Sequence, residues 1–277
     1  MYKIIEKEQL NETVQRMVIE APFVARRCEA GQFIILRVDE DGERIPLTVA
    51  DYNRAERTVT IIYQVVGHST RALSEKAVGD SVLDFVGPLG KATELKPHQR
   101  VLGVGGGVGT APLFPQLKKL SEMGVEVDVV VGGRSKDYVI LKDELKEFCS
   151  NVYVATDDGS EGKKGFVTDV VAALIDEGNV YDEVIAIGPL PMMRAIVQLT
   201  KKENIPTNVS LNPIMIDGTG MCGGCRVTVG GETKFACIDG PDFNGFEVDF
   251  EGLMNRQQFY KEEEAHTCQM SVGSNIE

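Results

Sequence analysis

The sequence lacks any run of 18 uncharged apolar residues, the length that marks a membrane-spanning helix. Its first ten residues mix charged and apolar side chains, so it also lacks the apolar core of a signal peptide. Positive charge is in deficit, with 29 Lys and Arg against 42 Asp and Glu and a formal net charge of -13. A nucleic-acid surface needs concentrated positive charge to displace phosphate counterions. We therefore predict a cytoplasmic protein that binds small molecules and proteins, and neither nucleic acid nor membrane.

Histidine is scarce, with three residues in a chain of 277, whereas six cysteines are present and unevenly placed. Cys222, Cys225 and Cys237 lie close together, and in a reducing compartment such clustering indicates metal or redox chemistry before disulfides. The isolated cysteines are expected to be small buried or surface residues: Cys28, Cys149 and Cys268. Since 43% of the residues are apolar, the length allows two or three domains with ordinary cores.

Residues 1–98 are predicted to form a small antiparallel barrel. Short alternating or β-branched runs at 33–38, 58–66 and 81–86 are separated by glycine turns, and closely spaced strands of this kind are typical of barrels. The polar segment that follows contains Pro97 and His98. It is interpreted as a linker with a solvated histidine.

Residues 99–205 are predicted to form an α/β domain. A strand at 101–104 leads through a glycine-rich turn into a helix at 110–123, with Leu113, Leu117 and Leu120 on one face. Further elements continue the alternation, with strands at 125–131, 152–156 and 183–187 and helices at 166–177 and 192–201. This order predicts a parallel sheet covered by helices on both faces.

The rest of the chain divides into two parts. Residues 206–255 are glycine-rich and hold the cysteine cluster, and residues 256–277, with three consecutive glutamates, are predicted to be a solvated or partner-contacting tail. The expected fold is an antiparallel β-barrel domain and a parallel-sheet α/β domain, followed by a small C-terminal metal-binding segment.

The cysteine spacing is the most informative pattern. Ferredoxin-type [2Fe-2S] clusters are held by C-x4-C-x2-C and a distant fourth cysteine. Here the spacing is D-x4-C-x2-C-x11-C, so Asp217 stands where the first cysteine would be and its carboxylate can serve as an anionic ligand beside Cys222, Cys225 and Cys237. Glycines around these residues suit a loop that wraps closely around a cluster.

Three other interpretations stay open. Asp217 and the three cysteines could bind tetrahedral zinc, although no histidine is nearby. Cys222 and Cys225 could form a CxxC redox pair, although such a pair is expected at a helix start after a strand. Asp217 could also be an ordinary turn residue, with water or hydroxide on the iron.

Two short stretches in the barrel region join charge, rigidity and hydroxyl groups. Arg44, Pro46, Leu47 and Thr48 form the first of them. The second stretch, Gly67, His68, Ser69 and Thr70, precedes a helix-like segment whose backbone N–H groups could face a diphosphate. Each stretch alone is weak evidence for a cofactor site. The evidence comes from their order along the chain, before an α/β domain.

A glycine loop follows the first strand of the α/β domain and opens its helix, which is the context that a phosphate-binding loop needs. The loop includes Gly105, Gly106, Gly107, Gly109, Thr110 and Ala111. A tight turn without a ligand is the alternative.

These residues, in this order, resemble the ferredoxin-NADP reductase superfamily over nearly the whole chain. The resemblance implies that Arg44 faces the FAD diphosphate together with Gly67 to Thr70, and that Pro46, Leu47 and Thr48 lie beside the isoalloxazine. Leu47 replaces the family's usual tyrosine, which puts aromatic stacking at that position in doubt. The glycine loop would bind the nicotinamide dinucleotide pyrophosphate.

A second family motif matches Gly188, Pro189 and Met192, except that Ile187 replaces the cysteine often found beside the hydride path. No catalytic residue is therefore assigned. Arg134 follows a strand end where the adenosine ribose would lie, and could accept a 2'-phosphate or be a surface charge. Asp157 and Asp158 face the same cleft in family members and would repel such a phosphate, so NAD(H) is predicted over NADP(H).

With its C-terminal [2Fe-2S] segment, the chain resembles the electron-transfer subunit of NAD-dependent dihydroorotate dehydrogenases. With Asp217 in place of the first cysteine, it resembles the small subunit of NADH-dependent reduced ferredoxin:NADP oxidoreductases, and this is the assignment that we prefer. The resemblance implies FAD, NAD(H) and [2Fe-2S] as cofactors and an electron-bifurcating complex. It also implies a larger iron-sulfur flavoprotein subunit that binds NADP(H) and ferredoxin. A non-catalytic redox-sensing or zinc-binding module is the alternative from another class.

Overall fold

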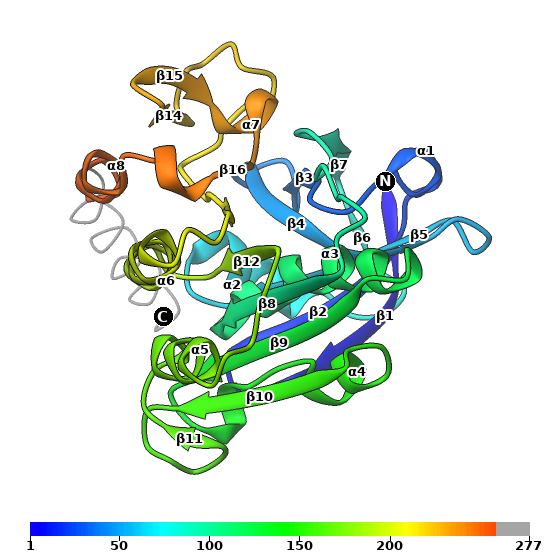
Figure 1. Ribbon diagram of the computed structural model, residues 1–277. Coiled ribbons are helices and arrows are strands. Elements are labelled where there is room, and N and C mark those ends of the chain that lie inside the picture. Colours follow the sequence, from blue (N-terminus) through cyan, green and yellow to red (C-terminus); the bar gives the residue numbers. More distant parts are fainter. Residues whose placement is uncertain (259–277) are drawn as a thin grey trace.

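The computed structural model describes residues 1–258, so most of the predicted tail, residues 259–277, lies outside the described residues together with Cys268. Two large sheets organise the described chain (Figure 1). None of its helices is both long enough and apolar enough to cross a membrane.

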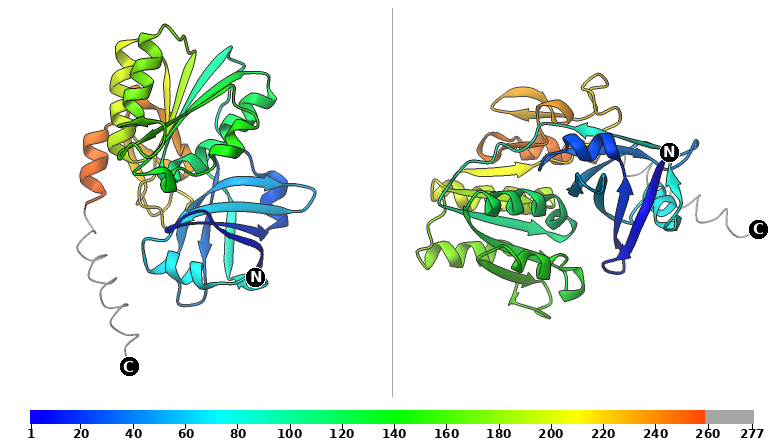
Figure 2. Two further views of the ribbon diagram at one scale, coloured as in Figure 1. Left: turned by 90° about the horizontal axis from the view of Figure 1, so that it is seen from below. Right: turned by 90° about the vertical axis from the view of Figure 1, so that its right-hand side faces the viewer.

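The first sheet is antiparallel and has seven strands in the order β6-β1-β2-β5-β4-β3-β7. Its strands are β1 (Tyr2–Gln9), β2 (Val14–Glu20), β3 (Phe33–Arg37), β4 (Ile45–Asn53), β5 (Thr58–Gln64), β6 (Ser81–Val82) and β7 (Asp84–Leu89). The sheet curls into a near-closed barrel (Figure 2), because alternate apolar side chains such as Met17, Ile34 and Ile61 turn inward and are fully buried. Two short helices accompany it, α1 (Pro22–Arg27) and α2 (His68–Glu75). The predicted barrel is confirmed.

The second sheet follows the order β11-β10-β9-β8-β12-β13-β16. Its strands are β8 (Arg100–Gly106), β9 (Glu126–Gly133), β10 (Asn151–Thr156), β11 (Lys163–Lys164), β12 (Glu183–Ile187), β13 (Thr207–Ser210) and β16 (Asp242–Asn244). All neighbouring strands are parallel except β13 and β16, which pair antiparallel at one edge. The predicted parallel sheet is confirmed.

Helices cover both faces of this second sheet, as the continuous apolar strands require. The helices and 3-10 turns are η1 (Gly107–Gly109), α3 (Thr110–Glu122), η2 (Lys136–Tyr138), α4 (Lys142–Lys146), α5 (Val167–Asp176) and α6 (Leu190–Lys202). Leu113, Leu117 and Leu120 of α3 pack on one face, and α5 and α6 pack on the other. The predicted elements are found within two or three residues of their expected bounds.

The cysteine-bearing segment lies beside both sheets (Figure 1). It contains the hairpin β14 (Arg226–Val229) and β15 (Glu232–Phe235), then α7 (Ala236–Asp239), β16, η3 (Gly245–Glu247) and α8 (Phe250–Arg256). Because β16 pairs with β13, this segment is hydrogen-bonded into the edge of the parallel sheet.

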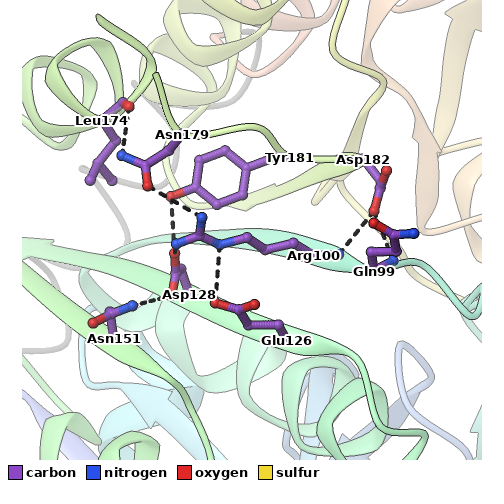
Figure 3. Close-up of polar contacts among 9 residues, drawn as sticks. All are labelled: Gln99, Arg100, Glu126, Asp128, Asn151, Leu174, Asn179, Tyr181 and Asp182. Carbon is purple, nitrogen blue, oxygen red and sulfur yellow. Dashed lines mark hydrogen bonds and ion pairs between the residues drawn. The ribbon is translucent and has the colours of Figure 1, made fainter. Parts of the chain in front are cut away.

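A buried ion pair fastens the amino ends of the parallel strands (Figure 3). The Asp128 side chain is completely buried and accepts hydrogen bonds from Arg100 at 2.6 Å, Tyr181 at 3.0 Å and Asn151 at 2.8 Å. The buried carboxylate thus contacts a cation and two neutral donors, and the cluster holds neighbouring strands together. The glycine loop lies at the opposite, carboxyl edge of the sheet.

Candidate functional site

One long cavity of about 1080 Å³ opens between the barrel and the parallel sheet. Barrel residues line one side, the carboxyl ends of the parallel strands line another, and residues 210–215 and Pro241 close a third. Single small-molecule sites are commonly about 300–1,000 Å³. The cavity therefore lies at the upper limit of this range.

The barrel wall of the cavity is formed by β4 and its neighbours. Pro46, Leu47 and Thr48 all line it, together with Phe33, whose backbone pairs with Thr48 across β3 and β4. Tyr63 contributes a further aromatic ring, and burial raises its pKa, so its hydroxyl stays neutral and donates to Gln15 at 2.9 Å. This wall is mostly apolar, which suits an aromatic ring system.

The start of α2 faces free space. A Cβ placed on Gly67 would meet no atom within 4 Å. Thr70 lines the cavity and its hydroxyl accepts hydrogen bonds from the backbone N–H groups of Val66 and Gly67, both at 3.0 Å. These contacts fix the first turn of α2, whose N–H groups suit an anionic ligand.

Gly67 and three other barrel residues predicted for the site lie outside the cavity lining. Arg44 and His68 are exposed, and Ser69 is buried with its hydroxyl 3.2 Å from Glu43. Arg44 and His68 therefore face solvent, whereas the Ser69 side chain is engaged within the barrel.

The glycine loop makes the opposite wall. Gly106, Gly107 and Gly109 line the cavity, and Gly107 has φ +55, where an added Cβ would meet no atom within 4 Å. A Cβ on Gly109 would collide with the carbonyl oxygen of Ile187. Glycine is thus required at one position for backbone geometry and at the other for close packing.

The remaining loop residues support this wall from behind. Gly105 and Ala111 are buried, and the Thr110 hydroxyl is buried without a hydrogen-bond partner among the described residues. Gly188, Pro189 and Met192 line the cavity across from the loop, and a Cβ on Gly106 would collide with the Met192 sulfur. The glycine loop and the segment from Gly188 to Met192, both predicted from the sequence, therefore lie side by side.

The far end of the cavity is polar. Arg134 and Asp157 are exposed and line it, and the Phe166 ring lies beside them with 65% of the residue exposed. Asp158 turns away, because it accepts hydrogen bonds from the backbone and hydroxyl of Ser160, and these lower its pKa. Of the two predicted carboxylates, only Asp157 lines the cavity.

Several lining residues were not singled out from the sequence. Four of them are aromatic and four are small polar residues or prolines: Phe33, Tyr63, Tyr138, Phe166, Ser210, Asn212, Pro213 and Pro241. Phe166 immediately precedes helix α5 at the carboxyl edge of the sheet, and that position was the available signal.

Asp217 organises the loop that carries the cysteines. Its two carboxylate oxygens accept hydrogen bonds from the backbone N–H groups of Thr219 and Cys222, both at 2.9 Å. These bonds lower the pKa of Asp217, so the group is anionic at neutral pH. Gly218, Gly220 and Gly223 adopt positive φ and let the loop turn tightly.

Cys225 and Cys237 are buried side by side, since the Cys237 backbone N–H lies 3.4 Å from the Cys225 sulfur. Cys222 is exposed and accepts from the Gly224 N–H at 3.4 Å. Burial and the neighbouring Cys225 raise the pKa of Cys237 to about 12. A metal would replace these thiol protons, and the backbone N–H groups aimed at sulfur suit thiolate ligands.

Within residues 1–258, no three His, Cys, Asp or Glu side chains converge on a single metal position. A tetrahedral zinc ion needs four such groups around one point, whereas a [2Fe-2S] cluster distributes four ligands over two irons. One carboxylate and three cysteines supply four donors, the number that such a cluster distributes over its two irons.

Fold and cavity together define an oxidoreductase in which a barrel and a dinucleotide-type sheet share one site, and the segment before the cysteine loop closes it. The family model of the iron-sulfur cluster binding domain of dihydroorotate dehydrogenase B matches residues 212–249, and that of the oxidoreductase NAD-binding domain matches residues 104–198. These matches cover the cysteine loop and the glycine loop.

Known relatives extend the match to almost the full chain. The dihydroorotate dehydrogenase B electron transfer subunit homolog of Thermotoga maritima is 48% identical over 95% of this chain and 92% of its own length. The electron transfer subunit of Fusobacterium nucleatum is 34% identical over 89% and 96%. The solved structure of NADH-dependent reduced ferredoxin-NADP oxidoreductase is 44% identical, covers 98% of both chains and has a TM-score of 0.93.

The chain belongs to the family of dihydroorotate dehydrogenase B electron transfer subunits and their homologues. It is an NAD(H)-dependent oxidoreductase subunit whose cofactors are FAD and an iron-sulfur cluster.

Proposed function

We propose that the chain exchanges hydride between NAD(H) and FAD and single electrons between FAD and a [2Fe-2S] cluster, within an electron-bifurcating NADH-dependent ferredoxin:NADP oxidoreductase. The observation that carries this proposal is the shared cavity, which joins Thr48 of the barrel to Gly107 of the glycine loop and reaches Met215 before the cysteine loop. When bound, FAD converts between the two-electron chemistry of nicotinamide and the one-electron chemistry of a cluster.

The residues of this chain position and shield the reacting groups. Pro46, Leu47 and Thr48 would hold the isoalloxazine against the barrel, while Arg44 and the first turn of α2 would bind its diphosphate. The loop from Gly105 to Ala111 would bind the dinucleotide pyrophosphate at the start of α3. Gly188, Pro189 and Met192 would cover the nicotinamide and exclude water from the hydride path.

NAD(H) fits the polar end of the cavity better than NADP(H). Asp157 is the carboxylate that faces this end, and it would repel a 2'-phosphate, while Arg134 can contact a ribose or pyrophosphate oxygen. Two opposite charges at the same rim leave no net positive site for an added phosphate.

Four residues would bind the cluster: Asp217, Cys222, Cys225 and Cys237. The loop hydrogen bonds already hold Asp217 close to Cys222, and Cys225 lies against Cys237. This pairing would give each iron two ligands.

A larger partner subunit is supported by the surface around Cys222. Ile216 is 55% exposed and Met221 is 89% exposed, and Ile214 and Ile238 are also exposed around the same loop. Exposed apolar side chains grouped around a redox centre suit contact with another protein. This partner would be a larger iron-sulfur flavoprotein that binds NADP(H) and ferredoxin, and the complex would be cytoplasmic.

The test is anaerobic purification from the native cell, followed by identification of the partner and analysis of flavin, iron and sulfide per chain. We expect one FAD, two irons and two sulfides in this chain, NADH-dependent bleaching of the flavin absorption, and a partner that reduces NADP and ferredoxin. A partner that binds FMN and oxidises dihydroorotate would instead assign the chain to the dihydroorotate enzyme. Colourless protein after reconstitution would leave the redox-sensing or zinc-binding module.

A further inference from the structure

A carboxyl group that the proposed chemistry does not use lies where three parts of the chain meet. Asp242 belongs to β16, which follows the cysteine loop. Its Oδ2 atom accepts a hydrogen bond from the hydroxyl of Thr93, which lies in the segment that follows the barrel strand β7. The same atom accepts a second hydrogen bond, from the Gln116 amide nitrogen of α3 at 3.1 Å. Gln116 is completely buried. One carboxyl oxygen therefore joins the cluster segment to the barrel side and to the helix that opens at the glycine loop.

Two oxygen atoms of this group are buried without a hydrogen-bond partner among the described residues, namely Asp242 Oδ1 and Gln116 Oε1. An ionised carboxylate and an amide carbonyl are both acceptors, so neither can satisfy the other. A single proton on Oδ1 would turn that oxygen into a donor. The acid O–H could then donate to Gln116 Oε1 while the amide N–H donates to Oδ2, which is the two-bond ring that a carboxylic acid forms with a primary amide.

The surroundings favour the neutral acid. Burial raises the pKa of Asp242, and the hydrogen bonds from Thr93 and Gln116, with the Ser210 hydroxyl nearby, only partly oppose this effect. These three groups are uncharged. A negative charge on Asp242 would raise the pKa of Glu183. Glu183 itself pairs with His98 at 3.3 Å. Within residues 1–258, the group therefore has no cation in contact to hold it ionised.

We propose that Asp242 is a protonated carboxylic acid that forms a two-hydrogen-bond ring with the Gln116 amide, and that this pair positions the cluster segment against α3 and the barrel. Asp242 is a positioning residue, because Pro241 and Ser210 line the cavity and Asp242 lies behind them. Gly31 of the barrel packs against this group. A Cβ on Gly31 would collide with the Thr93 hydroxyl and lie 2.9 Å from Asp242 Oδ2.

Protonation is tested by infrared spectroscopy of the holoprotein. The carbonyl stretch of a protonated carboxylic acid is expected near neutral pH in the wild type and should be absent from Asp242→Asn. Asparagine has the same shape and keeps one donor and one acceptor for the ring. A wild-type spectrum without this band, or an equal band in Asp242→Asn, would overturn the protonated state.

The pH dependence of stability gives a second measurement. A pKa raised in the folded state means that the folded protein binds more protons, so wild-type stability falls as pH rises above the unfolded value of about 3.9 and until the folded pKa is passed. Asp242→Asn lacks this proton. The Tm difference between variant and wild type should therefore move in favour of the variant as pH rises from about 5 to about 8. A Tm difference that stays constant over this range would mean an ionised carboxylate whose pKa is not raised, and would overturn the protonated state.

The positioning role, which rests on the proposed function, is tested by rapid mixing with NADH. In Gln116→Met and Asp242→Ala, flavin bleaching should keep its wild-type rate, while cluster reduction should slow at least tenfold, and Asp242→Asn should restore it. Equal cluster reduction in wild type and Gln116→Met would overturn the positioning role. If NADH reduced neither centre in the wild type, the proposed function would fail, whereas the infrared and pH measurements would still decide the state of Asp242.

Discussion

The Nη2 atom of Arg100 lies 2.6 Å from Oδ2 of Asp128, and this pair joins the first strand of the parallel sheet to its neighbour at the edge opposite the cavity. The Arg100 side chain is 24% exposed and that of Asp128 is fully buried. An ion pair in this place serves the sheet and is separated from the site by the length of the strands.

We expect Asp128→Ala to destabilise the fold by about 3–5 kcal/mol, because it leaves the partly buried Arg100 charge and the Tyr181 and Asn151 donors without their acceptor. Thermal unfolding measures the effect. Asp143→Ala is the matched control, since Asp143 pairs with Lys146 on an exposed helix and its loss should leave Tm almost unchanged. The KM for NADH should be the same in all three proteins. A raised KM in Asp128→Ala would contradict the separation of the two edges.

Gly107→Ala should weaken NADH binding about tenfold, equivalent to about 1.4 kcal/mol. The added Cβ meets no protein atom, so it would occupy space that the dinucleotide needs. FAD content should be unchanged. Gly124→Ala carries the same left-handed strain, with φ +84 and no neighbouring atom, but lies at the end of α3 away from the cavity. Equal KM values for these two variants would show that strain, and not the ligand, requires Gly107.

Gly109→Ala should behave differently from Gly107→Ala. Its Cβ would collide with the Ile187 carbonyl oxygen where the loop packs on β12. We therefore expect a lower Tm and poor expression, in addition to weaker NADH binding. A Gly109→Ala protein with wild-type Tm would mean that the loop can move away from β12.

Asp217→Ala should make the cluster labile, since it removes the proposed anionic ligand and the two backbone hydrogen bonds that this side chain accepts. Asp217→Cys should keep a cluster with four sulfur ligands and an altered potential. Iron and sulfide per chain, with the absorption spectrum, measure both outcomes. Asp249→Ala is the control, because Asp249 likewise accepts a backbone N–H, from Gly252 at 3.0 Å, but at an exposed helix start. If Asp217→Ala kept its cluster content, spectrum and potential, Asp217 would not be a ligand.

Cys28 and Cys149 should resist alkylation in the native protein. Burial raises the pKa of each thiol to about 12, with smaller contributions from Glu29 at Cys28 and from Asp128 at Cys149. The thiolate is the reactive form, so modification should stay slow across neutral and mildly alkaline pH. Peptide mass spectrometry after a timed pulse measures it, with urea-unfolded protein as the fully modified control. Rapid labelling of either thiol in folded protein would contradict its raised pKa.

Local patterns predicted the elements of the parallel sheet well. The strand, glycine loop and helix from Val101 to Met123 follow from apolar periodicity and from a turn that only glycine fits, and both are properties of neighbouring residues. The cysteine spacing is also a property of neighbouring residues, and the assignment of Asp217 and the three cysteines as ligands stays a prediction.

Contacts between distant residues could not be predicted in this way. His98 was expected to be solvated, but it is half-buried and pairs with Glu183. This prediction was wrong because the partner belongs to another strand of the fold. Asp157 and Asp158 are neighbours in sequence, yet a hydrogen bond to Ser160 turns only the second one out of the cavity. The pairing of Asp242 with Gln116 spans 126 positions. Such contacts depend on the assembled packing.

The antiparallel pairing of β16 with β13 limits how the protein can be divided. A cut near residue 206 would not release a separate ferredoxin-like module, because it would strip two strands from the sheet that carries the glycine loop. Engineers who wish to exchange the metal-carrying part for another must therefore replace the sheet edge with it, and the distance that an electron travels inside this subunit is set by the backbone and not by a swinging tether.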